Sequence, residues 1–214
     1  MRRRTAAFSA LLSVLLLVLT IPAASAGPAR TEFAGFVFPA GMFDSVVGLP
    51  TGTSCTAMKG TYVATSPPAC VLDPGTTKEL GDGRTLIRNE VFLDQSLAWH
   101  TAAEALGYLG SGTPTPDELR RTGYNVETFN ANFDATFSGT AWGSWAFYQV
   151  YPGGDPIFTG TFTGSFDNGK GTLRAIGIGV GEYKGEHVWM DVFPSLDVNM
   201  TGVFRDAGSD HSAP

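Results

Sequence analysis

FTGTFTGSFDNGKGTLRAIGIGV, residues 158–180, contains the turn and both arms of one β-hairpin. Asn168-Gly169 is a dipeptide that two-residue type I′ turns prefer, because both central residues of the turn take a positive φ. If Asp167 faces Lys170 across the turn, each large side chain on one face lies opposite a small residue: Phe158 opposite Gly179, Phe162 opposite Ala175, Gly164 opposite Leu173 and Phe166 opposite Gly171. Alternation of large and small residues is typical of the interior of a small β-barrel.

The glycines of the second arm do not form a nucleotide-binding loop. Gly177, Gly179 and Gly181 recur every two residues, whereas a dinucleotide fingerprint needs G-x-G-x-x-G between a strand and a helix. Lys184 stands where the third glycine of the Gly179 frame would be, and no helical pattern follows. These glycines are therefore interpreted as structural.

The two-residue period continues through most of the chain. In NVETFNANFDATFSG, residues 125–139, Phe and Ala occupy odd positions from Phe129 onward, and polar residues occupy the even ones. The segments with strand character are FAGFVF near Phe36, Met58–Ala64, Arg84–Leu93, residues 125–139, Ala141–Tyr151, the two arms of the hairpin and Glu186–Phe193. We therefore expect an all-β fold, a single antiparallel β-barrel of about eight strands with one short inserted helix and one disulfide.

The inserted helix is expected between Asp94 and Leu109. This segment is rich in Ala and Leu, and Leu93, Leu97, Thr101 and Ala105 recur at helical spacing. Farther on, Thr115 and Glu118 form a capping-box pattern around Pro116, which predicts one more helical turn.

An apolar stripe lies on the other face of the hairpin. Ile176, Ile178 and Val180 alternate with the glycines. Since exposure of an apolar stripe to solvent is unfavourable, we expect it to be covered, either by the helix that ends near Leu109 or by another subunit of a homo-oligomer. The helix is favoured because it is tethered nearby.

The first 26 residues have the pattern of a signal peptide. MRRR supplies a positive region, an apolar run follows, and Ala24 and Ala26 occupy the small positions of a cleavage site before Gly27. We expect export by the general secretory route, a barrel domain over residues 27–205 and a disordered tail over 206–214. Nothing after Ala26 is long and apolar enough for an integral membrane segment. The predicted location is therefore secreted, extracellular.

The charge and the cysteines limit the partners. The chain carries a net charge of −6, and loss of Arg2, Arg3 and Arg4 with the signal peptide makes it more negative, which argues against nucleic acid and anionic membranes. Cys55 and Cys70 are expected to form a disulfide after export, which stabilises the fold by about 3 kcal/mol on the chain-entropy estimate. The alternative of free thiols or half of a metal site lacks regularly spaced further ligands, so no metal and no cofactor is expected.

Candidate ligand-binding residues lie on both faces of the segment 125–139. Asn130, Asn132 and Asp134 share one face and either present hydrogen bonds to a ligand or form the solvated face of the strand, the latter being favoured. Phe129, Phe133 and, from the hairpin, Phe162 lie on the predicted apolar faces, where a barrel ligand would contact them.

No combination of titratable residues carries a catalytic signature. His187 and Asp191 share a strand face but lie about 13 Å apart at 3.3 Å per residue, which excludes a direct dyad. Arg88 and Glu90 are interpreted as a same-face surface ion pair, and His100 with Glu104 as a solvated pair on the helix. No serine stands in a nucleophile elbow.

Three stretches together resemble one family. NANFDATFSGTAWGSW, FTGTFTGSFDNGKGT and GIGVGEYKG are similar to secreted bacterial proteins assigned to the allene oxide cyclase-like (calycin-like) β-barrels. The resemblance covers most of residues 58–192 and implies an eight-stranded antiparallel barrel, often with an apolar cavity and in some relatives an oligomer. Relatives of this barrel class isomerise an unstable epoxide or steer radical coupling. No motif of this sequence matches either active site residue by residue, and a fold alone does not imply a reaction.

The sequence is compatible with two functions. The favoured one is a non-catalytic extracellular barrel that binds a small apolar or amphipathic molecule, or a partner, in or at the mouth of the barrel, although an interior filled by its own rings is nearly as well supported. The alternative is an isomerase or cyclase that shapes a reactive apolar substrate in a dry pocket. A buried carboxylate or His in the lumen would favour the enzyme, and a wholly apolar lumen would favour binding or simple packing.

Overall fold

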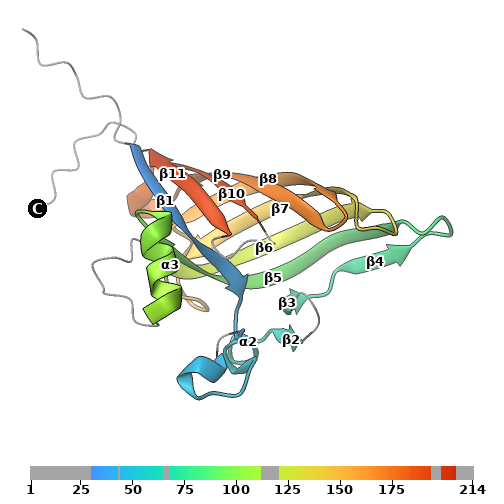
Figure 1. Ribbon diagram of the computed structural model, residues 1–214, viewed down its shortest axis with the longest axis horizontal. Coiled ribbons are helices and arrows are strands. Elements are labelled where there is room, and N and C mark those ends of the chain that lie inside the picture. Colours follow the sequence, from blue (N-terminus) through green and yellow to red (C-terminus); the bar gives the residue numbers. More distant parts are fainter. Residues whose placement is uncertain (1–29, 43, 65–67, 112–120, 194–198, 206–214) are drawn as a thin grey trace, which may run out of the picture.

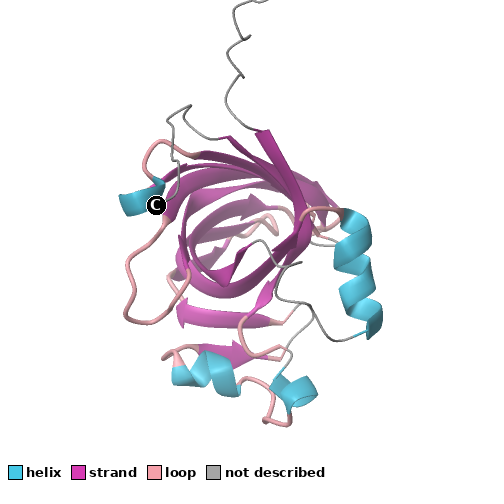
Figure 2. Ribbon diagram, turned by 90° about the vertical axis from the view of Figure 1, so that its left-hand side faces the viewer, coloured by secondary structure: helices cyan, strands magenta, loops and turns pink. Residues whose placement is uncertain are grey.

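The computed structural model describes residues 30–42, 44–64, 68–111, 121–193 and 199–205, and in them eight antiparallel strands close into a barrel (Figures 1 and 2). Around the ring, each strand is hydrogen-bonded to the next, and pairing of the first strand with the last closes the circle. The order is β1 (Arg30–Pro39), β11 (Met200–Arg205), β10 (His187–Val192), β9 (Lys170–Gly179), β8 (Phe158–Asp167), β7 (Gly139–Tyr148), β6 (Arg121–Phe133) and β5 (Thr85–Trp99). The all-β barrel predicted from the sequence is confirmed.

The central hairpin has the predicted register. Asp167 pairs with Lys170, and Phe158 with Gly179, while Asn168 and Gly169 take φ of 50° and 73° at the turn. The glycines also seat rings from neighbouring strands: a Cβ added to Gly177 would lie 2.5 Å from Cζ2 of Trp145. Bare backbone therefore makes room for the rings that fill the barrel, as the alternation of large and small residues predicts.

The ring is longer on one side than on the other. β1 pairs with β5 only from Asp94 to Trp99, and β10 pairs with β9 only as far as Leu173. β5 to β9 therefore continue past the last rung shared with β1 and β10, as Figure 1 shows at its right. Along this extension the free edge of β5 is bonded instead by β3 (Ala69–Asp73) and β4 (Thr76–Glu79).

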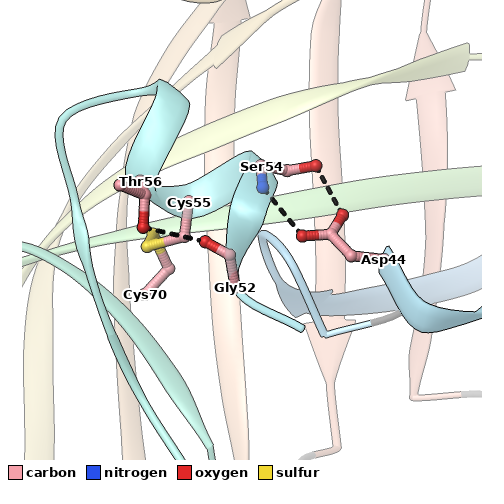
Figure 3. The surroundings of a disulfide bond; sticks show 6 residues. All are labelled: Asp44, Gly52, Ser54, Cys55, Thr56 and Cys70. Carbon is pink, nitrogen blue, oxygen red and sulfur yellow. Dashed lines mark hydrogen bonds between the residues drawn. A yellow bond between two sulfur atoms is a disulfide. The ribbon is translucent and has the colours of Figure 1, made fainter. Parts of the chain in front are cut away.

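A small layer held by the disulfide covers one outer face of the barrel. It consists of η1 (Asp44–Val47), α2 (Thr53–Ala57), β2 (Thr61–Val63) and β3. Cys55 of α2 is bonded to Cys70 of β3, which confirms the predicted pairing (Figure 3). The buried Asp44 carboxylate accepts hydrogen bonds from the backbone N–H (2.7 Å) and the hydroxyl of Ser54. Both cysteines pack with Leu93 of β5, so this layer shields the outer face of that strand.

The inserted helix is shorter than predicted. α3 runs from Ala102 to Ser111, and the expectation that it begins near Asp94 is wrong because residues 94–99 are the end of β5. The misleading signal was the four-residue spacing of Leu93 and Leu97, since an even spacing also keeps two residues on one face of a strand. Thr101 caps α3: its hydroxyl accepts from the Glu104 N–H (3.2 Å), and its own N–H donates to the Glu104 carboxylate (3.0 Å).

The helix does not cover the apolar stripe of β9. α3 packs on β1 and β5, where buried Ala105 contacts the cluster of Phe36 and Trp99. Because the connection from β5 to α3 is short, the helix lies on the strands next to β5, whereas β9 is on the opposite side of the ring. Ile176 and Ile178 are accordingly 56% and 55% exposed, and the prediction that α3 shields them is wrong.

Several predicted features lie outside the described residues: the signal peptide over 1–26, the Thr115–Glu118 capping box and the tail over 206–214. The short strands β3 and β4 and the barrel strand β11 were not expected from the sequence. Among the helices that the structure describes, none combines the length and the apolar character required to span a membrane.

Candidate functional site

The interior of the barrel contains carboxyl groups. Residues that are direct partners across the ladder share a face, so Asp94 lies inside with Asn125, and Glu127 lies inside with Phe92 and Trp145. Glu90 joins them because its partner is the inward Phe129. The inward positions whose side chains the structure describes hold these three carboxyls and no Lys, Arg or His.

Two neighbouring strands hold the carboxyl pair in place. Asp94 follows directly after Leu93, whose outward side chain is fully buried against the disulfide layer. This contact fixes the orientation of β5 about its own axis, so that the Asp94 side chain points inward. Glu127 lies on β6 two rungs along from Asn125, the partner of Asp94. Leu93 pairs with Val126, and both pack in the same outer cluster, which keeps the residues on either side of them pointing inward.

Burial changes the acidity of this pair. Removal from water raises the pKa of Asp94 to about 7. It also raises the pKa of Glu127 to about 8, with the nearby negative charge of Asp94 as the second cause. Burial raises the pKa of Glu90 as well. Near neutral pH the pair therefore holds a proton, and one carboxyl can donate a hydrogen bond while the other accepts one.

Neither member of the pair has a hydrogen-bond or ion-pair partner among the described residues. Trp145, 6% exposed, shares this property: its buried Nε1–H finds no acceptor in the described part of the chain. Beside it, the Asn125 amide donates to the Ser96 hydroxyl. The two carboxyls are half-buried, whereas the Trp145 Nε1–H is fully buried, and a buried polar group without a partner is rare in folded proteins and calls for an explanation.

The surroundings of the polar cluster are aromatic and tightly packed toward one end. Ser96, Asn125 and Trp145 border a cavity of about 40 Å³, whose remaining walls are apolar side chains from both halves of the ring. A cavity of this size holds one water molecule rather than a larger ligand. Toward the extension, the Phe129 ring lies 5.8 Å from Phe92 and 6.1 Å from Phe162. The interior is therefore filled at one end, with the carboxyl pair beside this aromatic group.

Asn130 and Asn132, predicted as ligand-binding residues, lie on the outer face and hold a β-bulge together. Asn89 takes a φ of 54° at the bulge, and its N–H donates to Oδ1 of Asn130 at 3.1 Å. The Arg88 guanidinium donates to Oδ1 of Asn132 at 2.7 Å and lies 5.2 Å from the Trp142 ring centre. Their polar groups are bonded to the bulge and do not converge with Asp134 on a common ligand position.

Asp134 has a role of its own in the turn after β6. Its Oδ1 accepts hydrogen bonds from the Thr136 hydroxyl (2.6 Å) and from the N–H groups of Ser138 (3.0 Å) and Thr136 (2.8 Å), and these bonds lower its pKa. Phe129, Phe133 and Phe162, the other predicted site residues, all lie on the inner face. Of the predicted residues, Phe129 and Phe162 are therefore the ones next to the carboxyl pair.

The other predicted pairs are resolved by the strand register. Arg88 and Glu90 do not form a same-face pair, because the bulge turns Arg88 outward and Glu90 inward. His187 and Asp191 lie on the outer face, where the Asp191 carboxylate is 3.4 Å from the Arg174 guanidinium. In the ranges that the structure describes, no three His, Cys, Asp or Glu side chains are grouped to hold a metal ion.

Asp94 and Glu127 were missed from the sequence for different reasons. Glu127 stands at an odd position, two residues before Phe129, so the alternation already placed its carboxyl on the apolar face. Asp94 was assigned to the helix, which removed it from the barrel wall. An acidic residue in phase with the apolar face of a strand is the signal that points to this site.

Comparison with known proteins gives no relative. No protein-family model matches the chain, and no significant match is found among the curated proteins or among the solved structures.

Proposed function

We propose that the protein binds a small amphipathic molecule inside the barrel, without catalysis. An ammonium group or another hydrogen-bond donor of the ligand meets Asp94 and Glu127, and its apolar part contacts Phe92, Phe129 and Phe162. The observation that carries the proposal is the pair of inward carboxyls, which have no partner among the described residues and lie beside aromatic rings.

Charge supports a cationic ligand. The described inward side chains include three carboxyls, which attract a cation that enters the barrel. Aromatic faces add to this attraction, because a cation within about 6 Å of a ring centre is held by its electron-rich face. An ammonium would also supply the donors that Asp94 and Glu127 lack, which offsets the cost of burying them.

The extension of β5 to β9 supports a route to the pair. Its inner face is not paired across by β1 or β10, and Glu90 and Phe92 lie on the part of β5 that precedes the pairing with β1. The opposite end is closed by packed rings around the cavity of about 40 Å³. A ligand larger than water therefore reaches the carboxyl pair from the extension.

Three probes with the same tail test this proposal. n-Octylammonium, 1-octanol and octanoate are titrated into the protein by calorimetry at pH 7. We expect octylammonium to bind at least about tenfold more tightly than 1-octanol, and octanoate to bind most weakly, because the pocket is anionic. Glu127→Gln should reduce the preference for the ammonium, and Glu182→Gln, exposed in the 3-10 helix η2 (Gly181–Tyr183), is the matched control. Equal affinity for the three probes, or none for any, contradicts the proposal.

A second function is favoured by one specific observation. The pKa values of about 7 and 8 for Asp94 and Glu127 allow a base and an acid to coexist near neutral pH, as proton-transfer isomerases require. The test is the conversion of 3-cyclohexenone to 2-cyclohexenone, in which a base removes the α proton and an acid returns a proton to the γ carbon. Turnover that is lost in Asp94→Asn would favour the isomerase over simple binding, and turnover at the background rate would dismiss it for this chemistry.

Export and cleavage form a separate part of the proposal. The N-terminal pattern predicts cleavage after Ala26, and the Cys55–Cys70 bond is of the kind that persists in oxidising compartments. Mass analysis of protein from the culture medium should give the mass of residues 27–214 less two hydrogens. An uncleaved mass would exclude this processing. The resemblance to allene oxide cyclase-like barrels stays a prediction, and nothing in the comparisons links the chain to those proteins.

A further inference from the structure

A groove of about 690 Å³ lies on the outside of the barrel. The residues that line it differ in chemical character from the polar cluster of the lumen. Its floor is the outer face of β9, β10, β11 and β1, and the segment that leads into α3 contributes His100, Thr101 and Ala102 to its lining. Its volume falls within the usual range for ligand sites, about 300–1,000 Å³. The groove is independent of the proposed function, because none of the described inward carboxyls lines it.

Two parallel rows of side chains form the floor. Ladder partners make an apolar row, Ile176, Trp189 and Val203, which ends at the acidic Glu32. The second rung along makes a polar row, in which Arg174 pairs with Asp191 and Asp191 with Thr201. Because both rows point outward and are separated by one inward rung, a ligand lying in the groove meets an apolar strip along one side and hydrogen-bonding groups along the other.

Trp189 is held in place and remains accessible. The His187 ring stacks on it at 5.7 Å, and the Arg205 guanidinium lies 5.1 Å from its ring centre. Neither of these two residues lines the groove, whereas the indole of Trp189 does and is 40% exposed. The tryptophan is therefore an oriented aromatic surface that borders the groove.

The polar row is also arranged in advance. Nε of Arg174 lies 3.4 Å from Oδ1 of Asp191, so donors and acceptors are presented side by side. The Arg174 side chain is 80% exposed and the Asp191 side chain 41% exposed, which leaves both able to bond a ligand. The groove also contains Glu32 beside Arg174 and Asp191, so it carries both signs of charge and does not select a strongly charged molecule.

The geometry points to a saccharide as the ligand of this groove. A pyranose ring has an apolar face of C–H groups and an edge of hydroxyls, which matches an apolar row with a tryptophan beside a row of Arg, Asp and Thr. The C–H face stacks on Trp189, and the hydroxyls bond to Arg174, Asp191 and Thr201. An extended chain of such rings follows the groove across the strands.

The test uses soluble β-1,4-linked hexasaccharides of glucose, xylose and N-acetylglucosamine. In ¹⁵N-labelled protein each of the four tryptophans gives one indole signal. At least one hexasaccharide should shift the Trp189 indole signal and leave the Trp142 signal in place. Trp142 is the matched comparison, because it is also an exposed strand tryptophan, 37% exposed, with an arginine 5.2 Å from its ring centre.

Two variants complete the experiment. Trp189→Ala should weaken binding by about tenfold or more, as the loss of an aromatic contact surface predicts, while Trp142→Ala should bind like the wild type. No shift with any of the three hexasaccharides overturns the inference, and so does an equal loss in both variants. A Trp189→Ala variant that changes the oligomeric state in light scattering would assign the groove to contact between copies, and this outcome also overturns it. Failure of the octylammonium titration leaves this result unaffected, since the two sites share no carboxyl.

Discussion

Gly177 shows how one missing side chain controls the packing of the barrel. A Cβ at this position would lie 2.5 Å from Cζ2 and 2.8 Å from Cη2 of Trp145, a residue that is almost fully buried. The indole cannot move away, because it is enclosed by the rings of the same cluster. We expect Gly177→Ala to lower the free energy of unfolding by about 1–3 kcal/mol, which urea denaturation measures. Gly81→Ala is the control, because no atom lies within 4 Å of its Cβ, and an equal loss in both variants would refute the packing argument.

Glu127 makes stability depend on pH. Its pKa is about 8 in the folded protein against an ordinary value of 4.5, so between these values the folded state binds more protons than the unfolded chain. The free energy of unfolding therefore falls as pH rises from 4.5 to 8, because ionisation is easier in the unfolded chain.

Glu127→Gln should remove most of this dependence. We expect the variant to be about 1–2 kcal/mol more stable than the wild type at pH 8 and nearly equal to it at pH 4. Urea denaturation at a series of pH values provides the measurement, with Glu182→Gln as the exposed control. A variant that loses stability with rising pH as steeply as the wild type would show that Glu127 ionises freely in the folded protein.

At the scale of elements, α3 is held to the barrel by a small contact. Ala105 is fully buried against Phe36 and Trp99, and Trp99 is itself fully buried under the helix. Ala105→Asp would place a charge in this contact, so we expect a loss of about 2–4 kcal/mol and a red shift of tryptophan emission as the helix leaves its site. Ala103→Asp, on the exposed side of the same helix, should change neither quantity. Similar losses in both variants would mean that the helix itself, and not its docking, is affected.

The same scale separates the elements that the sequence predicts from those that it does not. The β8–β9 hairpin follows from its own residues, since Asn168-Gly169 and the alternation of Phe with Gly are local signals. The end of β5 does not. Residues 94–99 have a composition that suits a helix, and their strand conformation depends on hydrogen bonds to β1, more than fifty residues earlier in the chain.

At the scale of the whole molecule, closure depends on the seam between β1 and β5. Gly35 pairs with Ala98, and a Cβ on Gly35 would overlap the carbonyl oxygen of Leu97 on the opposite strand. We expect Gly35→Val to open this seam, with a loss of about 3 kcal/mol or more and faster hydrogen exchange of the Phe36 and Leu97 amides. Amides of the β7–β8 ladder should stay protected. Uniform loss of protection in both ladders would show that the seam does not open separately from the rest.

The candidate site was predicted only in part, because it also depends on contacts between strands that local alternation does not reveal. Phe129 and Phe162 were expected on the inner face, and they lie there, because alternation assigns faces within each strand. Asn130 and Asn132 were expected either to bond a ligand or, as the favoured alternative, to form the solvated face of the strand, and their Oδ1 atoms accept hydrogen bonds from the bulge at Arg88 and Asn89. A bulge inserts one residue and turns a side chain to the other face, and nothing in the local alternation of β6 indicates that its neighbour contains one.

By itself, the sequence determined the strand period, the hairpin register, the pairing of its two cysteines and the apolar face of each arm, since these depend on local dihedral preferences and on few alternatives. Tertiary structure decided which strands meet at the seam, that Asp94 and Glu127 lie together in the lumen, and that α3 leaves the outer face of β9 uncovered. Which groups are buried and which are exposed depends on segments that are far apart in the chain. The raised pKa values and the exposed groove therefore arise only when the barrel closes.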